Sequence, residues 1–578
     1  MKRFGLGFLL GLLFSILVGV ILIFAALRFG ERKVSVASNS TLILHLEGDL
    51  PEQPPVEMPI PFLERRQPMT MIEAWQLLRR AASDARIKAI VLEPRGLDVG
   101  WAKLQELHDD IEAFKKSGKP VYAFLRGGGA HEYYVATAAD RVYMTPEDEL
   151  DLKGLSAQLL FVKGTLDKLG VDMQFEHVGK YKDAPDMFTR TSPTPETLEV
   201  MNAILDQYYG SLLDTIAKGR KKPAQDLRKL FDDGPFVGKE ALDGGLVDAL
   251  LYEDEVYSKL KEQIKVDITK IGDQDYLHAP PADGEGKNKV AYLVGEGDIT
   301  RGSTYDDGTE SGITAIGMVK TMRQIANDAS IKGVIFRIDS PGGDGIASDD
   351  ILHEAKLLSA KKPMIISMSD LAASGGYFIA MTGDQIVAYP NTLTGSIGVF
   401  FGKPDLKGLM AKLGVTETTL TRGRFADIET PLRPLNDAER AKLRGEIEFF
   451  YRDFVERVSA GRKKPYDQVE PLAQGRVWVG AQAKQNGLID ELGGLDRAVD
   501  LIKQKAKIPA SEKVALVMYP PRKSVWDLLF NRSDESIEAL IQKRAQSLAA
   551  RLPVRSVPLR ALLHGGMLAL MPYNLEIK

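Results

Sequence analysis

One serine stands where a nucleophile would be useful, in the stretch 363–381 (PMIISMSDLAASGGYFIAM). An apolar run typical of a strand stops at Asp370, and an apolar run typical of a helix begins at Tyr377. Ser374 therefore lies at a predicted strand-to-helix turn, where the following glycines let the backbone approach a ligand and helix N–H groups point outward. An S-G-G turn by itself is more often a plain turn or helix cap, so its function depends on the rest of the chain.

The composition excludes several classes of partner and site. The 578-residue chain carries 75 Lys and Arg against 79 Asp and Glu, a formal net charge of -4, so no basic excess indicates a nucleic-acid partner. The chain has no cysteine, which excludes disulfides, thiolate metal sites and cysteine nucleophiles. Zinc-protease, Walker and dinucleotide-binding motifs are also missing from any convincing context. We therefore expect neither a metal nor a cofactor.

An uncharged apolar segment, 4–27, separates Arg3 from Arg28 near the N-terminus. At about 1.5 Å per residue it is long enough to cross a hydrocarbon core of ~30 Å. A cleaved signal peptide is the alternative, but this apolar core exceeds the usual ~7–15 residues of such a peptide. The sequence predicts a single transmembrane anchor over residues 1–30, with the remaining chain on one side of the membrane.

The chain after the anchor repeats itself. AASDARIKAIVL at 81–92 matches IANDASIKGVIF at 325–336, and GRKKP at 219–223 recurs at 461–465. The offsets between matching segments are 244 and 242 residues, so the spacing is almost constant. Such a pattern indicates an internal duplication.

We divide the chain beyond the anchor into two homologous halves, a linker and a tail. In chain order these are 41–275, the linker 276–287, 288–519 and the tail 520–578. The linker is rich in Pro, Gly and charged residues, as flexible connections are. In the tail a basic amphipathic segment precedes an apolar one, which fits docking on the body of the protein as well as binding lipid.

Strands and helices alternate within each half. In the second half the buried run GVIFRID (333–339) precedes an amphipathic helical pattern at 345–360, and PMIISM (363–368) reads as the next strand. This alternation predicts an α/β fold built from crossover units. Two long segments rich in Leu, Glu, Lys and Arg, 195–230 and 433–465, are expected to be helices that pack on the sheets or on a neighbouring subunit.

A comparison of the halves shows that each has lost one of two polar groups. At the 244-residue offset, Ser374 corresponds to Ala130 and Lys182 corresponds to Ala426. If a serine and a lysine acted together in the ancestral unit, this chain keeps one of each. Only the second half keeps a D-S-P-G-G turn (339–343), whose glycines would expose N–H groups as an oxyanion hole requires.

These residues predict a Ser/Lys catalytic dyad divided between the two halves. Ser374 would attack an acyl carbon, and Lys182 would take its proton, which requires a lysine kept uncharged by burial. The N–H groups of Gly342, Gly343 and Gly375 would hold the oxyanion.

With these motifs the chain resembles the signal peptide peptidase A family, also called protease IV, in its long membrane-anchored bacterial form. The shared segments are D-S-P-G-G (339–343), A-S-G-G-Y (373–377), T-G-S-I-G (394–398) and G-K-Y-K (179–182). The resemblance covers most of the chain. It implies a crotonase/Clp-protease-like fold in each half, with Ser374 as the nucleophile and Lys182 as the general base.

The resemblance also implies an environment and partners. It points to a homotetrameric bowl on the periplasmic side of the bacterial inner membrane, in contact with membrane lipid. Its substrates would be released signal peptides and other apolar peptides. Ser396, in the T-G-S-I-G segment, could assist Lys182 or line the pocket, and a purely structural role is equally open. Asp183 departs from the serine expected after the lysine, and its carboxylate would favour a charged Lys182 unless it points away.

Two other functions fit parts of the sequence. A crotonase-like enzyme acting on acyl thioesters would use similar backbone N–H groups, but it would need acidic residues over the oxyanion hole and no nucleophile. A catalytically inactive membrane scaffold is the other alternative, because duplicated enzymes sometimes lose their activity. The complementary retention of Ser374 and Lys182 favours the protease.

Overall fold

The computed structural model describes residues 34–54, 68–282, 284, 286–302, 312–521, 567–571 and 577, together with Gly11. The expected anchor at 1–30 lies outside the described residues apart from Gly11, and most of the tail lies outside them too. Within the ranges just given, no helix is long and apolar enough to span a membrane. The anchor therefore stays a prediction from the sequence.

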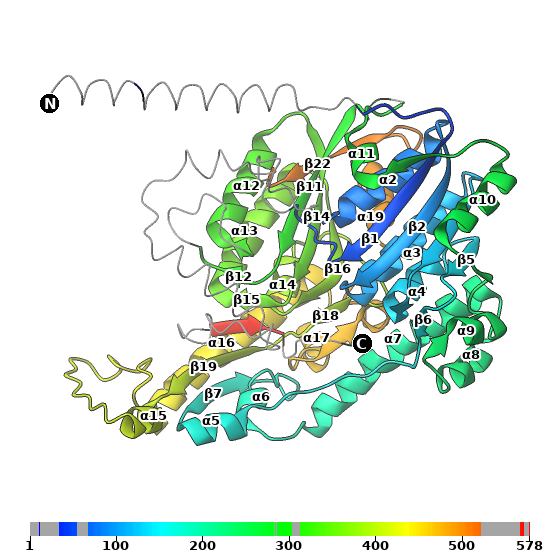
Figure 1. Cartoon of the computed structure of the whole chain (residues 1–578). Helices are drawn as coiled ribbons and strands as arrows, with labels where there is room; N and C mark the ends of the chain where they lie inside the picture. The colour runs from blue at the N-terminus through cyan, green and yellow to red at the C-terminus, as the bar shows by residue number, and fades with distance from the viewer. Residues whose placement is uncertain are drawn as a thin grey trace.

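A parallel sheet with the strand order β10-β1-β2-β3-β5-β9 organises the first half (Figure 1). Its strands are β1 (Ser40–Gly48), β2 (Ile87–Leu97), β3 (Val121–Leu125), β5 (Arg141–Met144), β9 (Ala249–Leu250) and β10 (Thr269–Gly272). Leu42, Leu44 and Leu46 of β1 enter one core while Ile43 enters another. A parallel sheet covered on both faces buries successive side chains in opposite directions in this way.

A second sheet, with the order β20-β18-β16-β14-β11-β22, organises the second half. Its strands are β11 (Asn288–Glu296), β14 (Ile331–Ser340), β16 (Met364–Ala373), β18 (Leu393–Gly395), β20 (Val477–Val479) and β22 (Val514–Tyr519). All neighbours are parallel except β18 and β20. The succession β14, α13 (Gly345–Lys361), β16 is the strand, helix and strand expected from the sequence, so the α/β prediction is confirmed.

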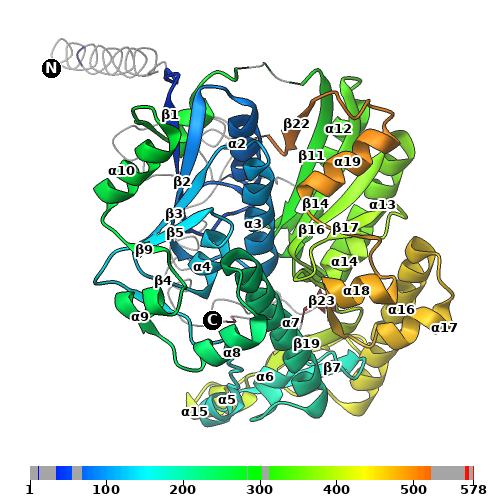
Figure 2. The same ribbon diagram turned by 90° about the vertical axis from the view of Figure 1, so that its right-hand side faces the viewer.

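Helices α2 (Met71–Ser83) and α3 (Trp101–Lys115) lie between the two sheets, as Figure 2 shows. The two long helices expected from the sequence are α7 (Pro195–Arg220) and α16 (Asp437–Arg462). Equivalent ion pairs fix their C-terminal ends, Arg220–Asp248 at 2.9 Å and Arg462–Asp490 at 2.6 Å. The repeat in the sequence is therefore also a repeat of packing.

The expected linker at 276–287 begins inside helix α11 (Asp273–His278).

A third sheet mixes the two halves, in the order β13-β12-β15-β23-β19-β7. Its strands are β7 (Asp172–Val178), β12 (Ile299–Thr300), β13 (Ile313–Thr314), β15 (Gly342–Asp344), β19 (Val399–Asp405) and β23 (Met567–Leu570). β7 of the first half runs antiparallel to β19 of the second, from Val178 opposite Val399 to Asp172 opposite Asp405. The strand that leads to Lys182 is thus built into a sheet of the half that carries Ser374.

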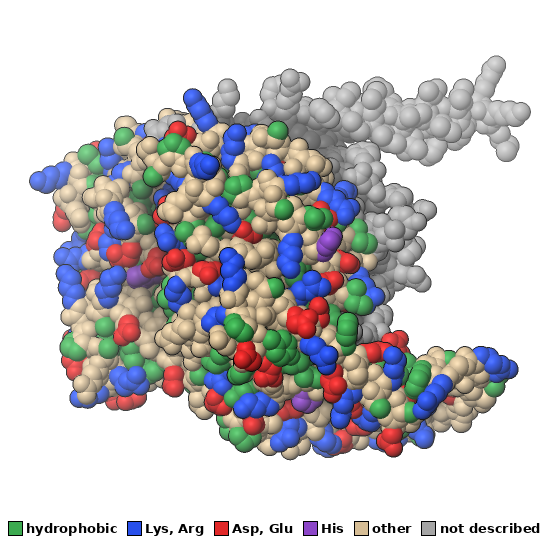
Figure 3. Space-filling model, turned by 180° about the vertical axis from the view of Figure 1, so that it is seen from behind, with side chains coloured by type: hydrophobic (Ala, Val, Ile, Leu, Met, Phe, Trp, Pro, Cys, Tyr) green, Lys and Arg blue, Asp and Glu red, His purple; other side chains and the backbone are tan. Residues whose placement is uncertain are grey.

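The paired β7 and β19 form an arm with α5 (Lys163–Leu169) and α15 (Lys407–Lys412), and the arm projects from the body in Figures 1 and 3. On the face seen in Figure 3, positive and negative side chains are interspersed. This mixture of signs is expected from the nearly equal numbers of basic and acidic residues in the chain, 75 and 79.

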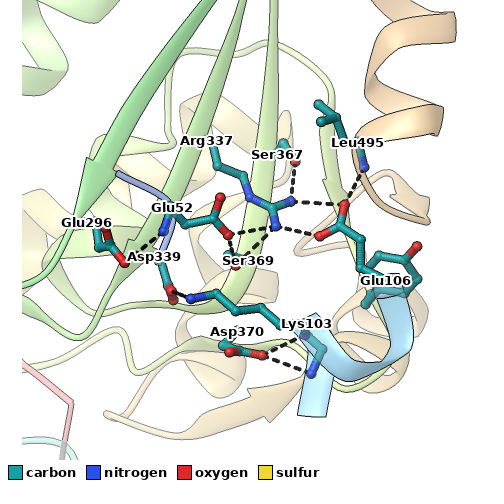
Figure 4. A network of polar contacts seen from close by, with 12 residues as sticks. Glu52, Lys103, Glu106, Glu296, Arg337, Asp339, Ser367, Ser369, Asp370 and Leu495 are labelled. Atoms are coloured by element: carbon teal, nitrogen blue, oxygen red, sulfur yellow. Dashed lines mark hydrogen bonds and ion pairs between the residues drawn. The ribbon is translucent and has the colours of Figure 1, made fainter. Parts of the chain in front are cut away.

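A buried network of charges joins the halves (Figure 4). Arg337 of β14, 1% exposed, donates to Glu52 at 2.8 Å and to Glu106 at 2.5 Å, and both glutamates belong to the first half. Lys103 of α3 pairs with Asp339 of β14 at 2.9 Å. Burial would raise the pKa of Glu52, but the charges of Arg337 and Lys103 lower it overall. The two cations therefore keep at least one carboxylate charged in the interface.

Asp370, near the end of β16, caps a helix of the other half. Its carboxylate accepts from the N–H groups of Gly100, Ala102 and Lys103 at 2.8–2.9 Å, at the N-terminus of α3. Gly100 has no side chain to cap the helix, and a Cβ there would lie 2.3 Å from the Asp370 carboxyl carbon. The first half is thus hydrogen-bonded to β16 four residues before Ser374.

We expect Arg337→Met to lower the free energy of unfolding by about 3 kcal/mol, because it leaves two buried carboxylates without their cation. Urea unfolding at constant pH measures the change. The control is Arg141→Met, which removes a pair with Asp248 in which the arginine is 58% exposed, and it should cost less than about 1 kcal/mol. Equal losses in the two variants would contradict the stabilising role of the network.

Candidate active site

Ser374 occupies the sharp turn between β16 and α14 (Gly375–Ile379). Its backbone has φ 53° and ψ -114°, which a residue with a side chain rarely adopts and which costs about 1–3 kcal/mol. Two backbone bonds hold it there: Ser374 N donates to Gly395 O at 2.8 Å, and Phe378 N donates to Ser374 O at 2.8 Å. The residue is fully buried. The sequence prediction of a strand-to-helix turn is confirmed.

Lys182 reaches Ser374 from the other half of the same chain. It lies on the turn after β7, and its side chain is 0% exposed. Its Nζ donates to Ser374 Oγ at 2.9 Å, to Ser396 Oγ at 3.0 Å and to Ser396 O at 3.2 Å. The structure therefore brings together three of the residues singled out from the sequence, within one chain.

Burial lowers the pKa of Lys182 to about 7, against a smaller opposing effect of the Asp183 carboxylate. The amine is thus largely neutral just above neutral pH. Asp183 accepts a hydrogen bond from the hydroxyl of Thr197, in the first turn of α7. The pKa of the lysine is low despite this neighbouring carboxylate because burial outweighs the carboxylate's charge.

The three glycines expected at the oxyanion hole pack against one another. A Cβ on Gly375 would lie 3.0 Å from Gly342 Cα and 3.1 Å from Gly343 N, so the turn admits no side chain. The N–H of Gly342 donates to Ser340 Oγ at 3.1 Å. Of the three N–H groups, that of Gly342 is therefore directed at its own turn rather than at the space beside Ser374.

Comparison with known proteins gives the family. The model of peptidase family S49 matches this chain twice, at residues 113–267 and 356–509. The chain belongs to peptidase family S49. The two matched segments fall one in each half, as the duplication requires, and the residues described hold no cluster of His, Asp and Glu suited to a metal ion.

Curated relatives extend over most of the S49 chain. The chloroplastic serine protease SPPA of Arabidopsis thaliana is 36% identical over 78% of this chain and 68% of its own length. Protease 4 of Salmonella typhi is 31% identical over 84% and 79%, and Protease 4 of Haemophilus influenzae is 31% identical over 84% and 82%. The chain is therefore a serine protease. Its family membership argues against the two alternatives, the inactive scaffold and the acyl-thioester enzyme.

Solved structures share less with this chain. ClpP1 from Listeria monocytogenes is 14% identical over 35% of this chain and 91% of its own, with a TM-score of 0.21. A mutant of the membrane-bound stomatin-specific protease 1510-N is 14% identical over 41% of this chain and 98% of its own, with a TM-score of 0.24. Likeness at this level does not decide the fold.

A loop that the sequence did not single out packs against the lysine. Gly475, with φ 76°, lies so close that a Cβ would be 2.6 Å from Lys182 Cβ and 2.7 Å from Lys182 N. Tyr181 N donates to Gln474 O at 2.9 Å, and Gly475 N donates to Ile397 O at 2.8 Å. The loop therefore joins the lysine turn to the T-G-S-I-G segment. Its sequence, A-Q-G-R, contains no motif that would have revealed this role.

We expect Gly475→Ala to lower kcat/KM about 100-fold, because the added Cβ must displace Lys182 and a shift of about 1 Å is enough for such a loss. Hydrolysis of a fluorogenic apolar peptide measures the effect. Gly414→Ala is the matched control, since Gly414 has a similar φ of 71° but no atom within 4 Å of an added Cβ. If both variants lose activity equally, backbone strain rather than the position of the lysine is responsible.

Proposed function

We propose that this S49 peptidase is a membrane-anchored endopeptidase in which Ser374 is the nucleophile and Lys182 the general base. The observation that carries the proposal is the 2.9 Å separation of Lys182 Nζ and Ser374 Oγ, with both side chains fully buried. Burial keeps the pKa of the lysine at about 7, so the amine can accept a proton. A serine next to a neutral amine is an activated nucleophile.

The proposed reaction has two stages. In the neutral amine the lone pair of Nζ accepts a hydrogen bond from the Ser374 hydroxyl, and this proton passes to Nζ as Oγ bonds to the carbonyl carbon of the peptide. Nζ then gives this proton to the leaving amine nitrogen, and the carbon–nitrogen bond breaks. A water molecule then gives a proton to the same amine as its oxygen bonds to the acyl carbon. The carbon–Oγ bond breaks, and Nζ returns the proton to Ser374 Oγ. In both stages the N–H groups of Gly343 and Gly375 would stabilise the negative oxygen.

Ser396 is proposed to position the base. Its hydroxyl and its carbonyl oxygen both contact Lys182 Nζ, which leaves the amine aimed at Ser374. Ser396 itself has a positive φ of 49°, and its N–H donates to Arg476 O at 2.7 Å. A residue held in such a conformation by its neighbours orients a partner at little further cost in entropy.

The proposed substrates are apolar peptides, released signal peptides among them. The family resemblance and the predicted anchor support this proposal, since an anchored protease on the periplasmic side of the inner membrane meets such peptides beside the lipid. Alongside β15 and β19, an apolar cluster of Phe175, Phe188 and Phe400 offers contacts for apolar side chains.

A homo-oligomer, a tetramer by resemblance, is part of the proposal. Large apolar side chains are exposed on and near the projecting arm, and these are Leu160, Leu169, Leu413, Val415 and Leu420, with exposures from 49% to 87%. Apolar groups gathered on a protruding element are typical of subunit contacts.

Substitution of either member of the dyad should remove the chemistry but leave the fold. We expect Ser374→Ala and Lys182→Met each to lower kcat/KM by at least 1000-fold, and the double variant to be no worse than either single variant, because the two residues act as one unit. Hydrolysis of the fluorogenic peptide by detergent-solubilised full-length protein provides the measurement. Full activity in Lys182→Met would exclude the lysine as the base.

The activity should rise with pH through about 7. Below that value Lys182 is protonated and cannot accept the serine proton, so kcat/KM should fall about tenfold per pH unit. Above it the amine is neutral and the profile should level off. The profile of kcat/KM between pH 5 and 9 measures this, and a profile that is flat to pH 5 would contradict a lysine base.

A further inference from the structure

Strand β23, from the C-terminal tail, lies between two strands that flank the serine turn (Figure 1). It runs antiparallel to both. The paired residues are Gly342 with Leu570, Gly343 with Ala569 and Asp344 with Leu568 on β15, and Phe400 with Leu568 on β19. Just beyond the strand, Met571 N donates to Pro341 O at 2.8 Å. The segment therefore docks on the body of the protein, which was one of the two outcomes open for the tail.

The backbone of this strand reaches the active site. A Cβ on Gly342 would lie 2.0 Å from Ala569 O and 2.6 Å from Gly375 N, the N–H that follows Ser374. Ala569 O and Gly375 N thus flank the same point on Gly342. A peptide running along β15 past the nucleophile would have to occupy the space that the tail already fills.

The side chains of β23 alternate as those of a bound peptide do. Leu568 and Leu570, 3% and 5% exposed, point to the same side and pack with Phe400, beside Phe175 and Phe188. An extended peptide added to a sheet gains affinity from its backbone and specificity from every second side chain. Leucines two residues apart are therefore the side chains that this groove accepts.

We propose that β23 is a built-in occupant of the peptide groove and holds the protease in a self-inhibited state. This inference rests on the proposed function, because the groove matters only if Ser374 is the nucleophile. A tethered segment competes at a high effective concentration, on the order of millimolar. A substrate must displace β23 before it can pair with β15 and β19, so an abundant apolar peptide opens the site and a scarce one does not.

The test compares full-length variants that differ only in where two leucines become aspartates. Leu568→Asp with Leu570→Asp removes the apolar anchors of β23. Leu242→Asp with Leu357→Asp makes the same chemical change at side chains that are 37% and 47% exposed and lie away from the projecting arm. We expect the tail variant to show at least a fivefold higher kcat/KM than wild type, through a lower KM at similar kcat. The control should match wild type.

A peptide in trans gives the second measurement. Acetyl-MLALM-amide should inhibit the tail variant competitively, raising KM without changing kcat, whereas acetyl-MDADM-amide should not. Thermal unfolding checks that each variant folds. If the double substitution abolishes cooperative unfolding, Leu570→Ala takes its place, with an expected increase in kcat/KM of at least twofold.

The outcomes separate this inference from the proposed function. Each variant is also made with Ser374→Ala. If hydrolysis survives that change, the proposed function is wrong. If hydrolysis requires Ser374, but the folded tail variant has the kcat/KM of the control or a lower one, β23 does not inhibit and the inference alone is overturned.

Discussion

The proposed reaction requires a neutral amine kept from water beside Ser374, and the residues that enclose this amine come from both halves of the chain. Lys182 arrives on a turn of the first half, but the groups that surround its side chain, Ser396, Gly398 and Gly475, belong to the second. Its low pKa is a consequence of that enclosure rather than of a neighbouring charge. The pairing of β7 with β19 and the buried charges around Arg337 keep the enclosure closed.

The interface between the halves carries several buried charges. If Ser374 and Lys182 act together as proposed, activity depends on the alignment of the halves, and two contacts across the interface lie within four residues of Ser374 and Gly342. Asp370 holds the N-terminus of α3 four residues before Ser374, and Asp339 pairs with Lys103 three residues before Gly342. Buried ion pairs stabilise a fold less than apolar packing does, but they are favourable only when the two charged groups are held in a narrow range of relative positions.

The sequence was sufficient for the elements and for singling out Ser374 and Lys182, which the structure places in contact. The alternation of strands and helices, the repeat and the exchange of Ser374 for Ala130 are all local patterns. It was not sufficient for contacts between distant segments. The place of Gly475 against Lys182, the use of the Gly342 N–H by Ser340 and the position of β23 depend on how far-separated backbones meet. The anchor at 1–30, the oligomer and the peptide substrates stay predictions, because they concern residues outside the described ranges or other molecules.

The reactivity of Ser374 toward a small fluorophosphonate tests the central claim most directly, because the reagent reports the nucleophile without requiring a peptide to enter the groove. Labelling rates are measured from pH 5 to 9 in the wild-type protein and in Lys182→Met. The account predicts a wild-type rate that rises through a pKa of about 7, and a Lys182→Met rate that is at least 100-fold lower at pH 8. Equal labelling of the two proteins would show that the lysine of the first half does not activate the serine of the second.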